Sequence, residues 1–144
     1  MTQRHPGLEP FEALIGKWAT EATHPMMEGV VVPGTMSLEW LEGGHYLVQR
    51  IRNDHEAFPD AICVTGAPED GDGLVMEYFD SRGVRRTYGI GLEDGVLRMW
   101  RDHPGFAQRY AATLGHDGFE GLWQVAETPG DWRDDLRVAH RRVG

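Results

Sequence analysis

The sequence is poor in cysteine, and this limits how the chain could be cross-linked or could bind metal. Cys63 is the one cysteine among 144 residues, so no intrachain disulfide and no thiolate metal cluster can form. This composition is typical of a reducing compartment, and we expect a cytoplasmic protein. Cys63 lies in the apolar run of residues 61–64, which favours a buried, inert thiol over a nucleophile.

Basic residues are also scarce. Lys and Arg together number 14 against 23 Asp and Glu, which gives a net charge of −9 at pH 7. Nucleic acids and anionic membranes are bound by clustered Lys and Arg, so we expect neither as a partner. Basic residues do gather at residues 85–86 and 133–142, but alternation along a strand would spread them over two faces, as on a solvated surface.

Long hydrophobic runs are absent as well. No segment approaches the roughly 20 apolar residues that a transmembrane helix requires, and residues 1–10 hold no apolar core of signal-peptide length. The chain also lacks a phosphate-binding glycine-rich loop and the Gly-x-Ser-x-Gly motif of many hydrolases. No short motif therefore assigns a reaction.

Turn-forming residues, by contrast, are plentiful. There are 19 glycines and 8 prolines, and their clusters separate short segments at the spacing of about 8–12 residues that is typical of barrels and sandwiches. Residues 74–91 show the pattern best, because two runs of alternating apolar and polar residues flank a polar tip at residues 80–83. This pattern predicts a β-hairpin.

The same unit repeats along the chain. We expect a loose arm over residues 1–7, one short helix over residues 10–15, and then a series of strands. The expected strands are residues 17–23, 35–41, 45–52, 61–67, 74–79, 84–90, 96–101, 106–114, 119–126 and 132–142. No second helix could cross over between parallel strands, so neighbours should pair antiparallel. The sequence predicts one all-β domain over residues 1–144, a roughly ten-stranded antiparallel up-and-down barrel with one short N-terminal helix and room for a ligand.

A short motif supports this fold through a family resemblance. Gly16-x-Trp18, after a short helix and at the start of the first strand, resembles the calycin superfamily of lipocalins, fatty-acid-binding proteins and nitrobindins. Further stretches are similar to a bacterial group of lipocalin-like domains of unknown function. These are residues 39–44, 78–84, 104–109 and 132–136. The resemblance implies a calycin-like barrel and brings no established reaction.

Nitrobindins, within that superfamily, would add haem. They carry a segment ending in Tyr-Pro where this chain has residues 23–25, and their haem-ligating histidine lies on the last strand. Matching that strand puts Asp135 at the ligand position, before Leu136, while His140 has the opposite parity. A carboxylate is a poor substitute for imidazole as an axial ligand. We therefore expect no cofactor and keep haem as an alternative.

Alternation also predicts which side chains point into the barrel. The inward set on the four best-patterned strands is Arg86 and Tyr88; Phe106, Gln108 and Tyr110; Phe119, Gly121, Trp123 and Val125; and Trp132, Asp134, Leu136, Val138 and His140. A buried Arg86 or Gln108 would be unfavourable unless it is paired or faces a polar ligand. The favoured interpretation is a structural network, with Arg86 on Asp80 or Glu77 and Gln108 on a tyrosine hydroxyl.

From this set we predict that the barrel binds a small, largely apolar molecule in its interior. The expected apolar contacts are Trp40, Trp100 and Trp123, and the expected polar contacts are Tyr78, Arg86, Tyr88, Gln108 and His140. Aromatic walls with a few convergent polar groups are typical of such sites. A shift of one residue in strand parity would exchange these for their neighbours, with Arg50 and Arg109 as the main replacements.

Two other functions remain open. An isomerase, cyclase or hydrolase on the same barrel would use His45 or His140 as acid or base, with an arginine to stabilise negative charge; a haem protein is the other. A metal site is not expected, because the remaining histidines are dispersed over turns and arms. These are His5, His24, His55, His103 and His116. An exposed edge or apolar rim could support a homodimer.

Overall fold

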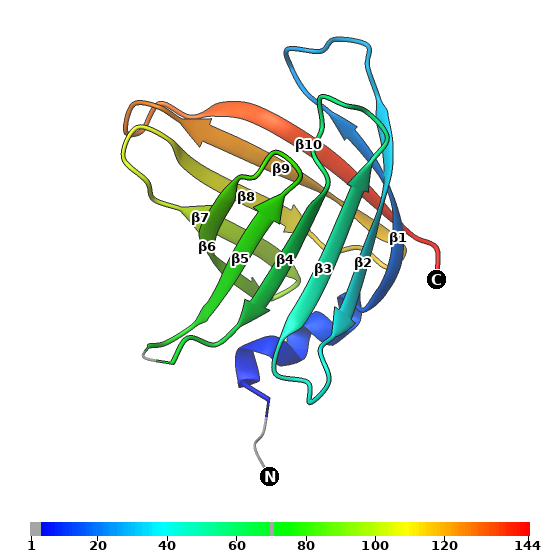
Figure 1. Cartoon of the computed structure of the whole chain (residues 1–144), viewed down its shortest axis with the longest axis vertical. Coiled ribbons are helices and arrows are strands. Elements are labelled where there is room, and N and C mark those ends of the chain that lie inside the picture. Colours follow the sequence, from blue (N-terminus) through cyan, green and yellow to red (C-terminus); the bar gives the residue numbers. More distant parts are fainter. Residues whose placement is uncertain (1–3, 70) are drawn as a thin grey trace.

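The structure, a computed structural model, describes residues 4–69 and 71–144. Ten antiparallel strands close into a barrel in which each strand pairs with its neighbour in sequence and the first pairs with the last (Figure 1). The strands are β1 (Gly16–Thr23), β2 (Val32–Trp40), β3 (Leu47–Asn53), β4 (Ala61–Gly66), β5 (Leu74–Asp80), β6 (Arg85–Glu93), β7 (Val96–Arg101), β8 (Ala107–Thr113), β9 (Gly118–Ala126) and β10 (Arg133–Arg142). The predicted up-and-down barrel is confirmed.

Turn chemistry fixes where the strands end. Between β5 and β6, the amide of Gly83 donates to the carbonyl of Asp80 at 2.9 Å, which is the expected hairpin tip. Between β6 and β7, Asp94 and Gly95 both have positive φ, 52° and 77°. Consecutive positive φ values are the mark of the tight turn that Asp-Gly sequences favour, because its twist matches that of the strands.

One end of the barrel is closed by a short helix. The 3-10 helix η1 (Pro6–Leu14) lies across the lower end in Figure 1 and buries Leu8, Phe11 and Leu14 among the strands. It begins earlier than the sequence predicted. Of the arm expected over residues 1–7, residues 1–3 lie outside the described residues, whereas Arg4 donates from Nε to the carbonyl of Gly44 at 2.8 Å. In the part of the chain that the structure describes, no helix has the length and hydropathy to span a membrane.

The start of β1 explains the Gly-x-Trp motif physically. Gly16 has φ +132°, and a Cβ there would lie 2.5 Å from the carbonyl oxygen of Gly144, so a larger residue would displace the C-terminus. Trp18 fills the space above η1, donating from its indole nitrogen to the carbonyl of Leu14 at 3.0 Å and meeting Phe119 edge-on at 5.3 Å. The motif therefore connects the first strand to the helix η1, through Trp18, and to the C-terminus, through Gly16.

A bulge in β10 changes the predicted facing of its first residues. The pairing of β10 with β9 shifts in register between Asp134 and Arg137. A β-bulge leaves an extra residue on one strand, so alternation is interrupted there. The prediction that Trp132 and Asp134 point inward is wrong: Trp132 stacks under Arg109, and Asp134 accepts from Gln124 at 2.9 Å, both on the outer surface.

We expect the helix to be a structural plug. Phe11 is 1% exposed, so Phe11→Ala should lower the free energy of unfolding by about 3–5 kcal/mol, as for other buried aromatic side chains. Urea unfolding followed by tryptophan fluorescence measures this. The control is Glu9→Ala on the exposed side of η1, which should change stability by less than about 0.5 kcal/mol. Equal losses in the two variants would show that η1 is not part of the core.

Candidate functional site

The barrel encloses a cavity of about 580 Å³. Side chains from all ten strands and from η1 line it. Its rim is formed by the loops at the end opposite η1, through residues 24–27, 57–59, 82 and 106. The volume falls within the roughly 300–1,000 Å³ of small-molecule sites. The interior can therefore hold one small ligand.

The lower part of the cavity is apolar and adaptable. Met36, Met76 and Met99 contribute thioethers from three different strands, and Leu38 and Ile90 lie between them. Cys63 also faces the cavity, where burial raises the pKa of its thiol to about 12. The thiol therefore stays protonated at neutral pH and is a poor nucleophile.

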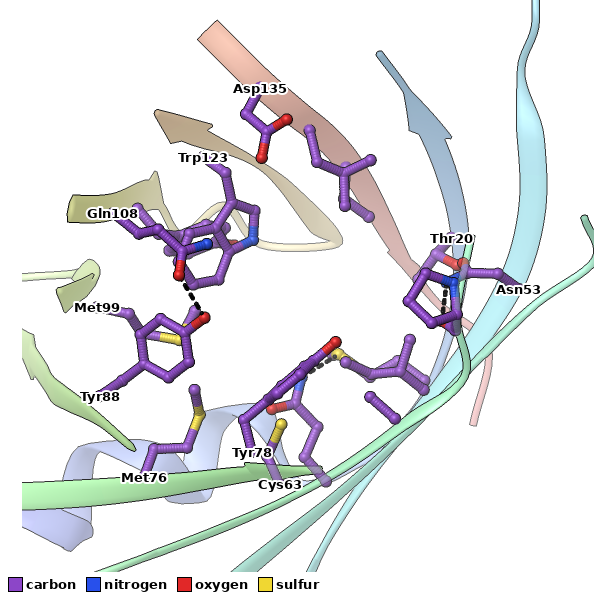
Figure 2. Close-up of a pocket in the computed structure, with 18 of the residues that line it drawn as sticks. Thr20, Asn53, Cys63, Met76, Tyr78, Tyr88, Met99, Gln108, Trp123 and Asp135 are labelled. Atoms are coloured by element: carbon purple, nitrogen blue, oxygen red, sulfur yellow. Dashed lines mark hydrogen bonds between the residues drawn. The ribbon is translucent and has the colours of Figure 1, made fainter. Parts of the chain in front are cut away.

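A polar cluster lies on one side of this cavity (Figure 2). The Tyr88 hydroxyl donates to Oε1 of Gln108 at 2.9 Å, and Trp123 meets the ring of Tyr88 at 5.4 Å between centroids. Burial raises the pKa of Tyr88, while a side-chain hydrogen bond from Arg86 and the positive charges of Arg86 and Arg101 act in the opposite direction. Oε1 of Gln108 accepts this bond, and no described residue accepts from its Nε2, so the Nε2 donors are available to a ligand.

Arg86 stands at the upper edge of this cluster. Its guanidinium carbon lies 5.3 Å from the centre of the Phe106 ring, and among the described residues it forms no salt bridge. The predicted pairing of Arg86 with Asp80 or Glu77 is wrong, because Glu77 is on the outer face, where it accepts from Thr87 at 3.0 Å. The predicted hydrogen bond of Gln108 to a tyrosine is present.

Asp80 is satisfied by other groups. Its enclosed carboxylate accepts from the Tyr78 hydroxyl at 2.7 Å and from Nη2 of Arg82 at 2.6 Å. Burial alone would raise the pKa of Asp80, but hydrogen bonds from Arg82, Tyr78 and two backbone amides outweigh it and hold the pKa well below its usual range. Burial and the Asp80 contact in turn raise the pKa of Tyr78. Arg82 is thus neutralised, whereas Arg86, the other arginine that lines the cavity, has no carboxylate partner among the described residues.

A histidine–aspartate pair lies at the rim. Nε2 of His24 is 2.6 Å from Oδ1 of Asp135, and Nδ1 of His24 accepts from the amide of Met26 at 3.0 Å. Both ring nitrogens of His24 are therefore engaged, with the proton on Nε2. Sequence reasoning missed this pair because the bulge in β10 turns Asp135 toward the cavity.

The same pair bears on haem. The position that the nitrobindin resemblance gives to the iron ligand holds Asp135, whose carboxylate is already bonded to His24. Neither residue of this pair offers a free imidazole nitrogen, so the pair does not fit an axial haem ligand. Among residues 4–69 and 71–144, no group of three or more His, Cys, Asp or Glu side chains is placed to hold a metal ion.

His140 lies deeper in the cavity wall. Its ring stacks on Phe119 with centroids 4.2 Å apart and an interplanar angle of 12°. Burial lowers the pKa of His140 to about 4. His45, the other histidine considered as an acid or base, lies in the β2–β3 turn and does not line the cavity.

The structure brings six of the eight predicted ligand contacts to one cavity. They are Tyr78, Arg86, Tyr88, Gln108, Trp123 and His140. Trp40 instead packs beyond the closed end, where its indole donates to Glu12 at 2.6 Å and Arg4 covers its ring. Trp100 lies on the outer face over Gly89 and is 49% exposed, because Met99 is the inward residue of β7.

Thr20 and Asn53 are among the other cavity residues that the predicted contacts did not include. Thr20 lies on β1 between the inward Trp18 and Ala22, so alternation alone could have found it. Asn53 ends β3, in a loop-rich stretch with no clear periodicity. Arg50 and Arg109, the replacements for a shifted parity, are exposed on the outer surface.

We expect His140 to stay neutral well below the pH at which an exposed histidine becomes charged. Its folded pKa of about 4 lies below the ordinary 6.5, so the unfolded chain binds the proton first, and stability should fall as pH drops from 6.5 toward 4. Imidazole ¹⁵N chemical shifts across this range measure the titration directly. A midpoint near 6.5, the ordinary value of a solvated imidazole, would contradict the buried placement.

Comparisons with known proteins support the fold. No protein-family model matches the chain, and no curated protein is similar to it in sequence. Among solved structures, the crystal structure of Rv2717c from M. tuberculosis is similar, with a TM-score of 0.66 and 12% sequence identity over 99% of this chain and 100% of that chain. At this identity the likeness concerns the backbone, and it supports the closed ten-stranded antiparallel barrel fold.

Proposed function

We propose that this protein binds a small, largely apolar molecule bearing an acidic group inside the barrel. The observation that carries the proposal is the composition of the cavity wall. An apolar interior of about 580 Å³ is combined with the unpaired guanidinium of Arg86 and the free amide donors of Gln108. Apolar pockets with few, convergent polar groups are typical of small-molecule sites.

The charge of Arg86 argues for an anionic group on the ligand. A half-buried cation is unfavourable unless it is compensated, and the carboxylates nearest in the hairpin are committed elsewhere, Asp80 to Arg82 and Tyr78. A ligand carboxylate would accept two donors from the planar guanidinium. Tyr88 would orient the adjacent Gln108 amide toward the same group.

The protonation and hydrogen bonding of the reactive side chains in the cavity favour binding over catalysis. The Cys63 thiol and the buried tyrosines have raised pKa values, so they are protonated and weakly nucleophilic at neutral pH. His24 has both nitrogens engaged. A general base or nucleophile with a partner that activates it is the mark of an enzyme site, but the His24–Asp135 pair has no ring nitrogen free to act as a base.

Arg86→Met tests the proposal. This change keeps an apolar stem and removes the charge, so we expect affinity for 2-naphthoic acid to fall about 10- to 100-fold, the worth of one charge-assisted contact. Affinity for the methyl ester of the same acid should change little. Isothermal titration calorimetry measures both.

Arg85→Met is the matched control, because Arg85 is the neighbour of Arg86 on β6 but lies on the outer face, 3.9 Å from Glu77. It should leave both affinities unchanged. Equal binding of the acid to wild type and Arg86→Met would overturn the role of Arg86. Failure of wild type to bind any apolar acid would overturn the proposed function itself.

A further inference from the structure

Two buried polar atoms of the cavity wall lack hydrogen-bond partners among the described residues. They are Oγ1 of Thr20 and Nδ1 of His140. Thr20 is only 4% exposed, and both residues line the cavity. They also face each other directly, because Thr20 and His140 are register partners between β1 and β10. Buried polar atoms are normally satisfied in folded proteins, so an adjacent pair requires an explanation.

Asn53 adds a third polar group beside Thr20, because Gly34, which lies between them, has no side chain. Gly34 on β2 pairs with Thr20 on one side and with Asn53 on the other. A Cβ at Gly34 would lie 2.7 Å from Oγ1 of Thr20 and 3.0 Å from Oδ1 of Asn53. The two oxygens therefore converge over Gly34. Nδ2 of Asn53 donates to the carbonyl of Pro59 at 2.8 Å, which fixes the amide with Oδ1 toward this side.

This cluster of Thr20, Asn53 and His140 lies across the cavity from the Arg86 side. In the closed strand order β1 and β6 are five positions apart in either direction, so Thr20 and Tyr88 are on opposite walls. Figure 2 shows the same arrangement, with Thr20 and Asn53 on one side of the open space and Tyr88, Gln108 and Trp123 on the other. The cavity thus has two polar ends separated by apolar side chains.

The chemistry of the cluster indicates what it would bind. Oδ1 of Asn53 is an acceptor, and Nδ1 of the neutral His140 ring is an acceptor when the proton is on Nε2. The Thr20 hydroxyl can donate or accept. A ligand group placed among them must donate at least one hydrogen bond and can accept another, which describes a hydroxyl group. A purely apolar or second anionic end would leave these atoms unpaired or repelled.

We propose that the cluster of Thr20, Asn53 and His140 is a second binding point, and that the ligand is an apolar hydroxy acid whose hydroxyl lies at the end remote from its carboxylate. This inference rests on the proposed function, because the acidic end would occupy the Arg86 side. The side-chain hydroxyl of Thr20 has no hydrogen-bond partner among the described residues. Its hydroxyl is therefore available for the ligand alone.

Matched acids test the second binding point. The rigid pair is 2-naphthoic acid and 6-hydroxy-2-naphthoic acid, and the flexible pair is decanoic acid and 10-hydroxydecanoic acid. Calorimetry should show that wild type binds the hydroxy acid about tenfold more tightly than its parent in at least one pair, the worth of one or two neutral hydrogen bonds.

Thr20→Val should abolish that preference, so that the hydroxy acid and its parent bind the variant with equal affinity. Valine has the same shape, and it removes an unpaired buried hydroxyl, so the melting temperature without ligand should be equal to or higher than that of wild type. Thr20→Ser keeps the hydroxyl and should keep the preference. Thr35→Val, at an exposed position of β2 next to Gly34, is the control and should behave as wild type.

The outcomes separate the two proposals. If parent and hydroxy acids bind equally well, or if the preference survives in Thr20→Val, the second binding point is wrong and the proposed function stands. If neither acid of either pair binds, the proposed function fails and the inference fails with it. A fall in the melting temperature of Thr20→Val would show that the hydroxyl serves the fold, which also overturns the inference.

Discussion

The seam between β1 and β10 is the constraint on which the rest of the structure depends. A ten-stranded antiparallel sheet holds a cavity only when its first and last strands pair, and here that pairing runs from Trp18 opposite Arg142 to Thr23 opposite Arg137. Arg142 also donates to the carbonyls of Ala13 and Ile15 and covers the ring of Trp18. The seam and the helix plug are thus one connected unit, and closure leaves no unpaired edge.

The closed wall allows charges at the rim to be satisfied in pairs. Asp80 is bonded to Arg82 and Asp135 to His24, each at 2.6 Å. His24 follows β1 and Asp135 lies on β10, so this pair would be apart in an open sheet, whereas Asp80 and Arg82 belong to one hairpin tip. Because Asp80 and Asp135 are already paired, neither carboxylate is available to Arg86. The electrostatic character of the mouth is therefore set by what is already paired around it.

The cavity wall combines side chains that stabilise the fold with a few polar side chains. Most of the wall is apolar, and its methionines and aromatic rings stabilise the barrel in the ordinary way. Thr20 and His140 depart from this pattern, since Oγ1 of Thr20 and Nδ1 of His140 have no hydrogen-bond partner among the described residues. Sites at which local rules are broken without compensation in the fold are where function is expected.

The sequence by itself determined the ten strands, the short helix and the facing of most strands, because alternation and turn residues act locally. It placed Tyr88, Gln108 and Trp123 in the cavity correctly. Only the tertiary structure decided the rest. The bulge in β10 reversed the parity at its start, and β7 turned Trp100 outward. The cluster over Gly34 joins residues from β1, β2, β3 and β10, and no local pattern encodes a contact that exists only when the barrel closes.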